Sequence, residues 1–201
     1  MSVWVIGAGG HAKVVIATLH AAGREVAGVL DDDAAKHGTT VLGVPVVGPV
    51  ERAAGGEAIV AVGHNAVRKR IVEALPEVRW ATAVHPSAVV HPSVEVGEGS
   101  VVFAGAVVQP DTHLGRHVIV NTGATIDHDG RLAGYVHVAP GTSLAGDVEL
   151  GEGVFLGIGA RVIPGVRIGA WTTVGAGGVV VRDLPGGITA VGVPARVRPE
   201  P

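Results

Sequence analysis

Aliphatic residues recur at every sixth position from Val84 to Val180 without a change of register. A second series of small or β-branched residues, from Ala88 to Gly178, lies two places before each of them. Two inward positions separated by two residues are typical of a short β-strand, and the constant period of six places a tight corner between successive strands. The pattern therefore predicts a parallel β-helix built from hexapeptide repeats.

Three such strands make one triangular coil of eighteen residues, so we expect each residue to lie beneath the residue eighteen places further on. The corners need either a positive φ angle or close backbone packing, and glycine satisfies both needs. Two series of glycines occupy corner positions: Gly97, Gly115, Gly151, Gly157, Gly169 and Gly175 in the first, and Gly99, Gly105, Gly123, Gly141, Gly153, Gly159, Gly165 and Gly177 in the second.

The first thirty residues have a different pattern, in which an apolar strand, Val3–Ile6, is followed by the glycine-rich segment Gly7–Ala12 and a helix that ends near Gly23. Such glycines let the backbone approach a phosphate, and the N-terminus of the helix favours an anion. A second strand, Glu25–Leu30, leads into Asp31–Asp33, where an acidic residue can bind a ribose. The motif alone is also compatible with a tight turn beside a solvated acidic loop.

Shorter elements complete this N-terminal part, and about eighty residues provide one mononucleotide-binding half rather than a full NAD site. We expect a Rossmann-like α/β half domain over residues 1–83, the β-helix over 84–181 and a C-terminal cap or tail over 182–201, where the six-residue period fails. The further elements expected before the β-helix are a strand Val44–Val47, a short helical turn from Pro49, a strand Ala58–Val62, a helix Ala66–Leu75 and a strand Trp80–Val84.

Composition narrows the class of protein. Of 201 residues, 47% are hydrophobic and 16% charged, which is enough apolar material for a sizeable core. The net charge of −3 argues against binding to nucleic acid or to a membrane surface. No apolar run approaches the roughly 20 residues of a membrane helix, and no basic leader is present, so we expect a cytoplasmic protein. The absence of cysteine excludes disulfides, thiolate nucleophiles and cysteine-bound zinc.

Among the histidines of the repeat, His128 is the candidate for chemistry. It lies between Asp127 and Asp129, either of which could orient one ring nitrogen so that the other acts as a base. Gly146 lies one coil further on, where its N–H could polarise a carbonyl oxygen. All six repeat histidines fall outside the inward positions and are expected to face solvent or a neighbouring subunit: His85, His91, His113, His117, His128 and His137.

His137 is nine residues from His128, which is one and a half repeats, so the two are expected on different faces of the prism. If both serve one site, that site is completed between subunits. A closed ring of identical subunits is the simplest arrangement, and a three-sided coil suits a trimer.

The chain resembles the hexapeptide acetyltransferases that act on sugars. Within them it is most similar to the bacterial N-acetyltransferases of nucleotide-linked 4-amino sugars, to which the sialic acid O-acetyltransferases are close relatives. The resemblance implies a left-handed β-helix, acetyl-CoA as co-substrate, a homotrimer and no metal. The matching segments are VIGAGGHAKVV, VLDDD, VGHNAVRKRI, VNTGATIDHDG, VHVAPGTSLAGDVELG, FLGIGARVIPGVRIG and VGVPAR.

The resemblance also implies roles for individual residues. His128 would be the general base, and Asp129 would orient it, at a position where the family often has glutamate. The remaining site residues that it implies are Gly9, Gly10, His11, Asp31, Asp32 and Asn121 for the nucleotide-linked sugar, and His137, Gly146, Ile158 and Ala176 for acetyl-CoA.

The chemistry expected is direct transfer of the acetyl group, because no cysteine or activated serine supports a covalent acyl-enzyme. Acetylation of a hydroxyl oxygen, as in the sialic acid O-acetyltransferases, is an alternative to acetylation of nitrogen. Two more distant alternatives are a zinc-dependent hydratase of the β-helix type and a non-catalytic nucleotide-sugar-binding protein.

Overall fold

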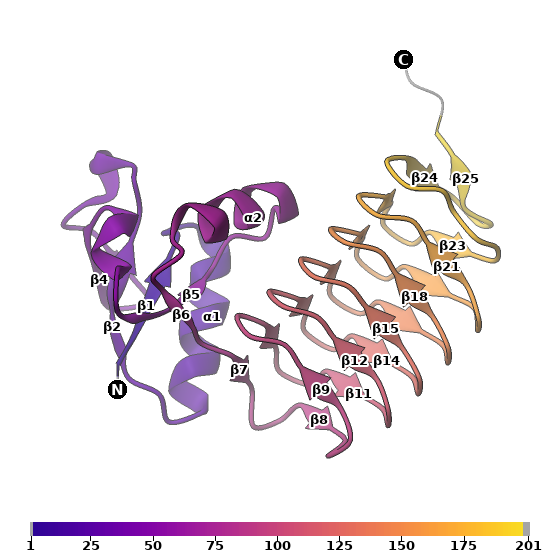
Figure 1. Ribbon diagram of the computed structural model, residues 1–201, viewed down its shortest axis with the longest axis horizontal. Helices are drawn as coiled ribbons and strands as arrows, with labels where there is room; N and C mark the ends of the chain where they lie inside the picture. The colour runs from indigo at the N-terminus through magenta and orange to yellow at the C-terminus, as the bar shows by residue number, and fades with distance from the viewer. Residues whose placement is uncertain (1, 199–201) are drawn as a thin grey trace.

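The computed structural model describes residues 2–198, which form two parts that lie side by side (Figure 1). An α/β domain occupies the N-terminal part of the chain. A stack of short strands extends away from it toward the C-terminus, with one coil added to the next. This arrangement confirms the predicted fold class.

The α/β domain is built on one six-stranded sheet with β1 at its centre, between β2 and β5. The strands pair in parallel, apart from the antiparallel pair β3 and β4. In sheet order the strands are β3 (Thr40–Val41), β4 (Val44–Gly48), β2 (Val26–Leu30), β1 (Val3–Ile6), β5 (Glu57–Val60) and β6 (Arg79–Trp80). The helical segments are α1 (Gly10–Ala21), η1 (Ala34–Lys36), η2 (Val50–Ala53) and α2 (Asn65–Ala74).

The expected strand Trp80–Val84 is wrong as a single element. Its first half is β6, whereas its second half, β7 (Ala83–Val84), belongs to the β-helix. Ala81 N–H still donates to Ala58 of the first sheet, and Ala83 N–H already donates to Ser100 of the β-helix. The sequence pattern does not reveal this transfer, because Ala81 and Ala83 are buried alike although they bond to different sheets.

The β-helix has three faces, each a parallel sheet. Face I contains β7, β10 (Val101–Val102), β13 (Ile119–Val120), β16 (His137–Val138), β19 (Phe155–Leu156), β22 (Thr173–Val174) and β24 (Thr189–Val191). Face II contains β8 (Val89–Val90), β11 (Val107–Val108), β14 (Thr125–Ile126), β17 (Ser143–Leu144), β20 (Arg161–Val162) and β23 (Val179–Val180). Face III contains β9 (Glu95–Val96), β12 (His113–Leu114), β15 (Arg131–Leu132), β18 (Glu149–Leu150) and β21 (Arg167–Ile168).

The register between coils is eighteen residues, as predicted. Val102 pairs with Val120, and Val120 with Val138, and the other two faces repeat this spacing. Both inward series form one continuous core. Residues of the first coil, such as Val84 and Val90, are only partly buried, because they lie at the open end of the prism (Figure 1).

The corners explain the two glycine series in different ways. Gly157 belongs to the first series, where an added Cβ would lie 2.7 Å from the backbone nitrogen of Ala176 in the next coil. Gly159 belongs to the second series and has a φ of +67°. This left-handed conformation recurs every six residues from Gly99 to Gly177. Six of these corners are not glycine: Asp111, His117, Asp129, Tyr135, Asp147 and Trp171.

The period changes at the C-terminal end of the β-helix. Leu184 pairs with Ile168, and Ala190 with Val174, so the register there is sixteen residues. The last strand, β25 (Arg196–Val197), then pairs antiparallel with β24 and ends the parallel stack. Met1 and residues 199–201, which fall within the expected first and last segments, lie outside the described residues.

The α/β domain is packed on face I. Outward-facing Val101 and Ile119 of the β-helix are almost fully buried, in the same apolar cluster as Val15 and Ile16 of α1. The apolar side of α1 is therefore shared between its own sheet and the β-helix. This shared core places the carboxyl ends of β1 and β5 beside face I.

Candidate active site

His128 lies at the corner between faces II and III, after β14 and before β15. Its Nδ1–H donates to Oδ2 of Asp129 at 2.7 Å, which leaves Nε2 as the free ring nitrogen. Its backbone N–H donates to Oδ1 of Asp127 at 2.9 Å. The carboxylate of Asp129 raises the pKa of His128 through this hydrogen bond, and the negative charges of Asp127 and Asp147 add to the effect. The imidazole is exposed and oriented as a base.

Gly146 lies directly over the ring of His128. A Cβ added at Gly146 would be 2.5 Å from Cε1 and 2.7 Å from Nε2 of His128. Within residues 2–198, the N–H of Gly146 donates to no protein acceptor. The predicted stacking is confirmed, and an unpaired backbone donor lies beside the free nitrogen of the imidazole.

The N-terminus of α1 forms an open cradle that can accept an anion. Gly9 caps this helix without a side-chain hydrogen bond, and the first turn has no acidic residue, so its first N–H groups are available to an anion. A Cβ added at Gly9 or Gly10 would meet nothing within 4 Å. The cradle lies at the ends of β1 and β5, where the direction of strand order reverses. Nucleotides bind at this position in such sheets, and it is called the crevice below.

Asp31 and Asp32 lie at the end of β2, next to this cradle. Oδ2 of Asp31 accepts from the N–H of Ala8 at 2.7 Å and from Lys36 at 3.0 Å. Oδ1 of Asp32 accepts from the N–H of Val50 at 3.0 Å. Both carboxylates therefore also fix the loops that border the crevice.

His11, Asn121 and His137 come together where the crevice meets face I. Nδ2 of Asn121 donates to Nε2 of His137 at 3.1 Å, and Nδ1–H of His137 donates to the carbonyl of Gly63 at 3.0 Å. The ring of His11 lies 6.1 Å from that of His137 and makes an edge contact with Phe103. Among the described residues, Nε2 of His11 is buried and has no hydrogen-bond partner.

The expectation that all repeat histidines face solvent or another subunit is wrong for His117 and His137. Both point outward from the coil, but the α/β domain of the same chain covers them, and they are 0% and 7% exposed. His117 stacks on Tyr135 and contacts the edge of Trp80. Burial lowers the pKa of each to about 4, as it does for His11. All three rings are therefore neutral near pH 7.

Arg68 of α2 is a structural residue that the sequence pattern did not single out. Its side chain is 1% exposed, and burial lowers its pKa to about 10. Within the described residues, its guanidinium pairs with no carboxylate. It donates to five oxygens instead: the carbonyls of Val62, Gly63, His117 and Tyr135, and Oδ1 of Asn65. Arg68 thus ties the loop after β5 to the β-helix.

A cavity of about 560 Å³ lies between the two parts of the molecule. Gly63, His64 and Asn65 form one wall, and His137, Phe155 and Trp171 of the β-helix belong to the other. The cavity begins beside the cluster of His11, Asn121 and His137, so it extends the crevice along face I.

The expected acetyl-CoA residues do not lie together. Gly146 shares the corner of His128, whereas Ile158 and Ala176 lie one coil apart at the corner between faces I and II. The side chain of Ile158 is 63% exposed. His137 lies with the expected sugar residues beneath the α/β domain. One chain therefore presents the base and the sugar cluster on different sides of the prism.

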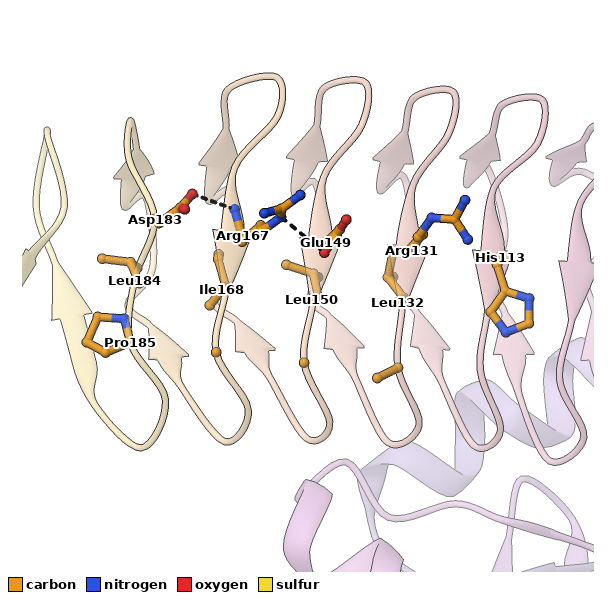
Figure 2. A pocket seen from close by; sticks show the side chains of 13 residues that line it. His113, Arg131, Leu132, Glu149, Leu150, Arg167, Ile168, Asp183, Leu184 and Pro185 are labelled. Atoms are coloured by element: carbon orange, nitrogen blue, oxygen red, sulfur yellow. Dashed lines mark hydrogen bonds and ion pairs between the residues drawn. The ribbon is translucent and has the colours of Figure 1, made fainter.

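A larger hollow, of about 760 Å³, lies on face III and holds none of the expected site residues (Figure 2). A row of charged side chains crosses it. Nε of Arg167 lies 3.2 Å from Oε2 of Glu149, and the backbone N–H of Arg167 donates to Oδ1 of Asp183 at 2.8 Å. These pairs compete with any ligand, so the hollow is the weaker candidate.

Two further observations concern metal ligands and membrane-spanning helices. In residues 2–198, no three His, Asp or Glu side chains are grouped so that they could hold a metal ion. Neither α1 nor α2 combines the length and hydropathy that crossing a bilayer would require.

The fold and the site together define an acyltransferase of the hexapeptide-repeat class, because a nucleotide-type crevice is joined to a β-helix that carries an oriented histidine base. Residues 2–75 match the family described as the PglD N-terminal domain. The chain belongs to the hexapeptide-repeat N-acetyltransferases of nucleotide-linked amino sugars, whose β-helix is left-handed.

Comparison with solved structures supports this membership. A histidine-to-asparagine mutant of perosamine N-acetyltransferase from Caulobacter crescentus, in complex with CoA and GDP-perosamine, is 47% identical with a TM-score of 0.93, over 100% of this chain and 98% of that chain. The acetyltransferase domain of PglB from Neisseria gonorrhoeae, in complex with acetyl coenzyme A, is 39% identical with a TM-score of 0.91, over 98% of each chain.

A curated relative agrees over part of its length. UDP-N-acetylbacillosamine N-acetyltransferase from Bacillus subtilis is 41% identical over 111 residues, which cover 50% of this chain and 50% of the relative. The matches span half or less of the length of the curated relatives.

Proposed function

We propose that the protein transfers the acetyl group of acetyl-CoA to the 4-amino group of a nucleotide-diphosphate-linked amino sugar, in the synthesis of a bacterial surface-glycan or glycoprotein sugar. The observation that carries this proposal is the pairing of His128 with Asp129 beneath Gly146. The relatives that bind CoA and GDP-perosamine support the choice of both substrates.

In the proposed reaction, Nε2 of His128 removes the proton of the amine as its nitrogen attacks the thioester carbonyl. The N–H of Gly146 stabilises the oxyanion that forms on the carbonyl oxygen. The C–N bond forms and the C–S bond breaks, and the imidazolium of His128 returns the proton to the sulfur of coenzyme A, which leaves as the thiol. Asp129 holds the imidazole by Nδ1–H, so Nε2 is the nitrogen that accepts the proton.

The α/β domain would bind the nucleotide part. The phosphates fit the open cradle at Gly9 and Gly10, and Asp31 and Asp32 border the space for the nucleoside. The sugar would then lie against His11, Asn121 and His137. GDP-perosamine is the first acceptor to test, because the Caulobacter enzyme that binds it is 47% identical to this chain.

The active site would be shared between subunits of a cytoplasmic homotrimer. His128 and Gly146 lie at one corner of the prism, and the sugar cluster lies on face I of the same chain. A neighbouring copy would bring its His128 to this cluster, and acetyl-CoA would lie in the groove between, against Gly146 of one chain and Ile158 and Ala176 of the other. Acetyl-CoA is available in the cytoplasm.

Release of coenzyme A thiol tests the activity directly. GDP-perosamine, a UDP-linked 4-amino sugar and free sialic acid would each be offered with acetyl-CoA to the wild type and to His128→Ala. We expect turnover with a nucleotide amino sugar that falls by roughly 10²-fold or more in the variant. Turnover with sialic acid alone would indicate O-acetylation, and undiminished activity of His128→Ala would exclude His128 as the base.

Mixed trimers test the shared site. His128→Ala and Asn121→Ala are each expected to lose most activity alone. If the two residues act across a subunit boundary, random trimers of the two variants regain about a quarter of the wild-type activity, since that fraction of boundaries has both residues intact. If both residues served a site within one chain, mixing would restore none.

A further inference from the structure

The corners of the β-helix contain an irregularity that concerns His128. Fourteen successive corner residues, spaced by six, have φ angles between 54° and 71°. Glycine adopts this conformation freely, whereas other residues are strained in it, aspartate and asparagine least. Eight of the fourteen are glycine. A side chain at any of the remaining six therefore calls for a reason.

Three of the six exceptions are explained by the packing of the α/β domain. His117, Tyr135 and Trp171 lie in one column at the corner between faces III and I, beneath α2. His117 stacks on Tyr135, and Lys69 of α2 lies over the rings of Tyr135 and Trp171. These side chains attach the domain to the β-helix.

The other three exceptions are all aspartates, and they form one column at the corner that carries His128. They are Asp111, Asp129 and Asp147, each eighteen residues from the next, and the following position in the column, Gly165, returns to glycine. Asp129 is explained, because it accepts the hydrogen bond of His128. Asp111 lies one coil below Asp129; its backbone N–H donates to Oγ of Ser93, and its exposed carboxylate makes no hydrogen bond or ion pair within residues 2–198.

Asp147 lies at the same corner, one coil above Asp129. Its N–H donates to the carbonyl of His128 at 2.9 Å, and it directly follows Gly146, the residue that lies over the imidazole. Its side chain is exposed and, within residues 2–198, makes no hydrogen bond or ion pair. Neither packing nor pairing accounts for a carboxylate at this strained position.

We propose that Asp147 is a positioning residue for the base: its carboxylate stabilises the imidazolium that His128 becomes when it takes the proton of the attacking amine. This inference rests on the proposed function, because it concerns that proton transfer. The charged groups around His128 are Asp127 and Asp129 on its own turn, Asp147 on the turn above and Asp111 on the turn below. Of these, Asp127, Asp129 and Asp147 raise the pKa of His128 by their charges.

The corner geometry allows a matched pair of variants. Asp147→Gly and Asp111→Gly each replace an aspartate by the residue that the left-handed corner prefers, so neither is expected to lower the Tm. Only Asp147→Gly removes a charge that acts on His128. Asp147→Asn removes the same charge and keeps a side chain that tolerates this conformation.

We expect both Asp147 variants to lower the pKa of His128 in an NMR titration of its ring protons. The acid limb of kcat/KM then moves to lower pH, and the plateau of kcat falls about three- to tenfold, because the base is weaker. The KM for acetyl-CoA stays near the wild-type value. Asp111→Gly leaves the pKa of His128 and kcat unchanged.

An unchanged pKa of His128 in Asp147→Asn would overturn the inference, as would an equal loss of kcat in Asp111→Gly. Failure of the proposed function would look different. In that case the wild type turns over no nucleotide amino sugar, or His128→Ala keeps full activity, while the NMR titration still reports whether Asp147 acts on His128.

Discussion

At the scale of single residues, the corner that carries His128 depends on the absence of a side chain at Gly146. The ring of His128 occupies the space where a Cβ would lie, 2.5 Å from Cε1. The eighteen-residue period places these two residues in contact, so this part of the site was predictable from sequence spacing alone. The spacing left open whether Asp127 or Asp129 orients the imidazole, because both are adjacent to His128; in the structure the ring pairs with Asp129.

Gly146→Ala tests this contact. The exposed imidazole is expected to rotate away from the new methyl group, so activity falls by at least about tenfold while the free energy of unfolding changes by less than about 1 kcal/mol. Gly134→Ala is the control. Gly134 lies at another corner, and a Cβ added there would come no closer than 3.4 Å to Arg116. Thiol release and urea unfolding measure the two quantities; equal activity in both variants would contradict the expectation.

At the scale of the coil, two glycines of one corner contribute to stability for different reasons. Gly157 allows the next coil to approach, since its Cβ would lie 2.7 Å from the backbone nitrogen of Ala176. Gly159 provides the left-handed turn and has open space around it. The period predicted both positions, but it did not assign close approach to one and positive φ to the other.

Alanine at these two positions should therefore destabilise the protein to different extents. Gly159→Ala introduces strain at one residue and is expected to cost about 1 kcal/mol. Gly157→Ala pushes against backbone that cannot move without separating two coils, and is expected to cost about 3 kcal/mol or more. Urea unfolding of both variants checks the order, and a larger loss in Gly159→Ala would show that conformational strain dominates at the corners.

At the scale of the whole molecule, the contact between the two domains buries three histidines and one arginine. The pKa values of His11, His117 and His137 are lowered to about 4 by burial, whereas an unfolded histidine titrates near 6.5. The unfolded chain binds more protons between these values. The contribution of these histidines to stability is complete above pH 6.5 and is lost as the pH falls toward 4.

We expect the free energy of unfolding to drop by on the order of several kcal/mol between pH 7 and pH 4.5. His117→Phe should weaken this dependence, because it removes one of the three titrating rings and two buried nitrogens that have no hydrogen-bond partner. His113→Phe is the control, since His113 is exposed on face III. Urea unfolding across this pH range measures both, and identical slopes for wild type and His117→Phe would contradict the assignment.

The sequence by itself determined the coil and the positions of its side chains relative to one another. The six-residue period fixed which side chains point inward, and arithmetic on that period placed Gly146 over His128. These features are local or strictly repeating, so they follow from spacing without knowledge of distant contacts. The glycine-rich turn after Val3–Ile6 and the acidic residues after Leu30 were likewise visible, because each lies at the end of a short apolar run.

Only the tertiary structure decided which outward face is covered. His117 and His137 point outward as the period predicts, yet the α/β domain buries them. Buried Arg68 donates hydrogen bonds to the carbonyls of His117 and Tyr135, which are 49 and 67 residues away along the chain. No local sequence pattern encodes such partners. Periodicity reports the direction of a side chain relative to its own coil, whereas burial depends on what packs against that coil.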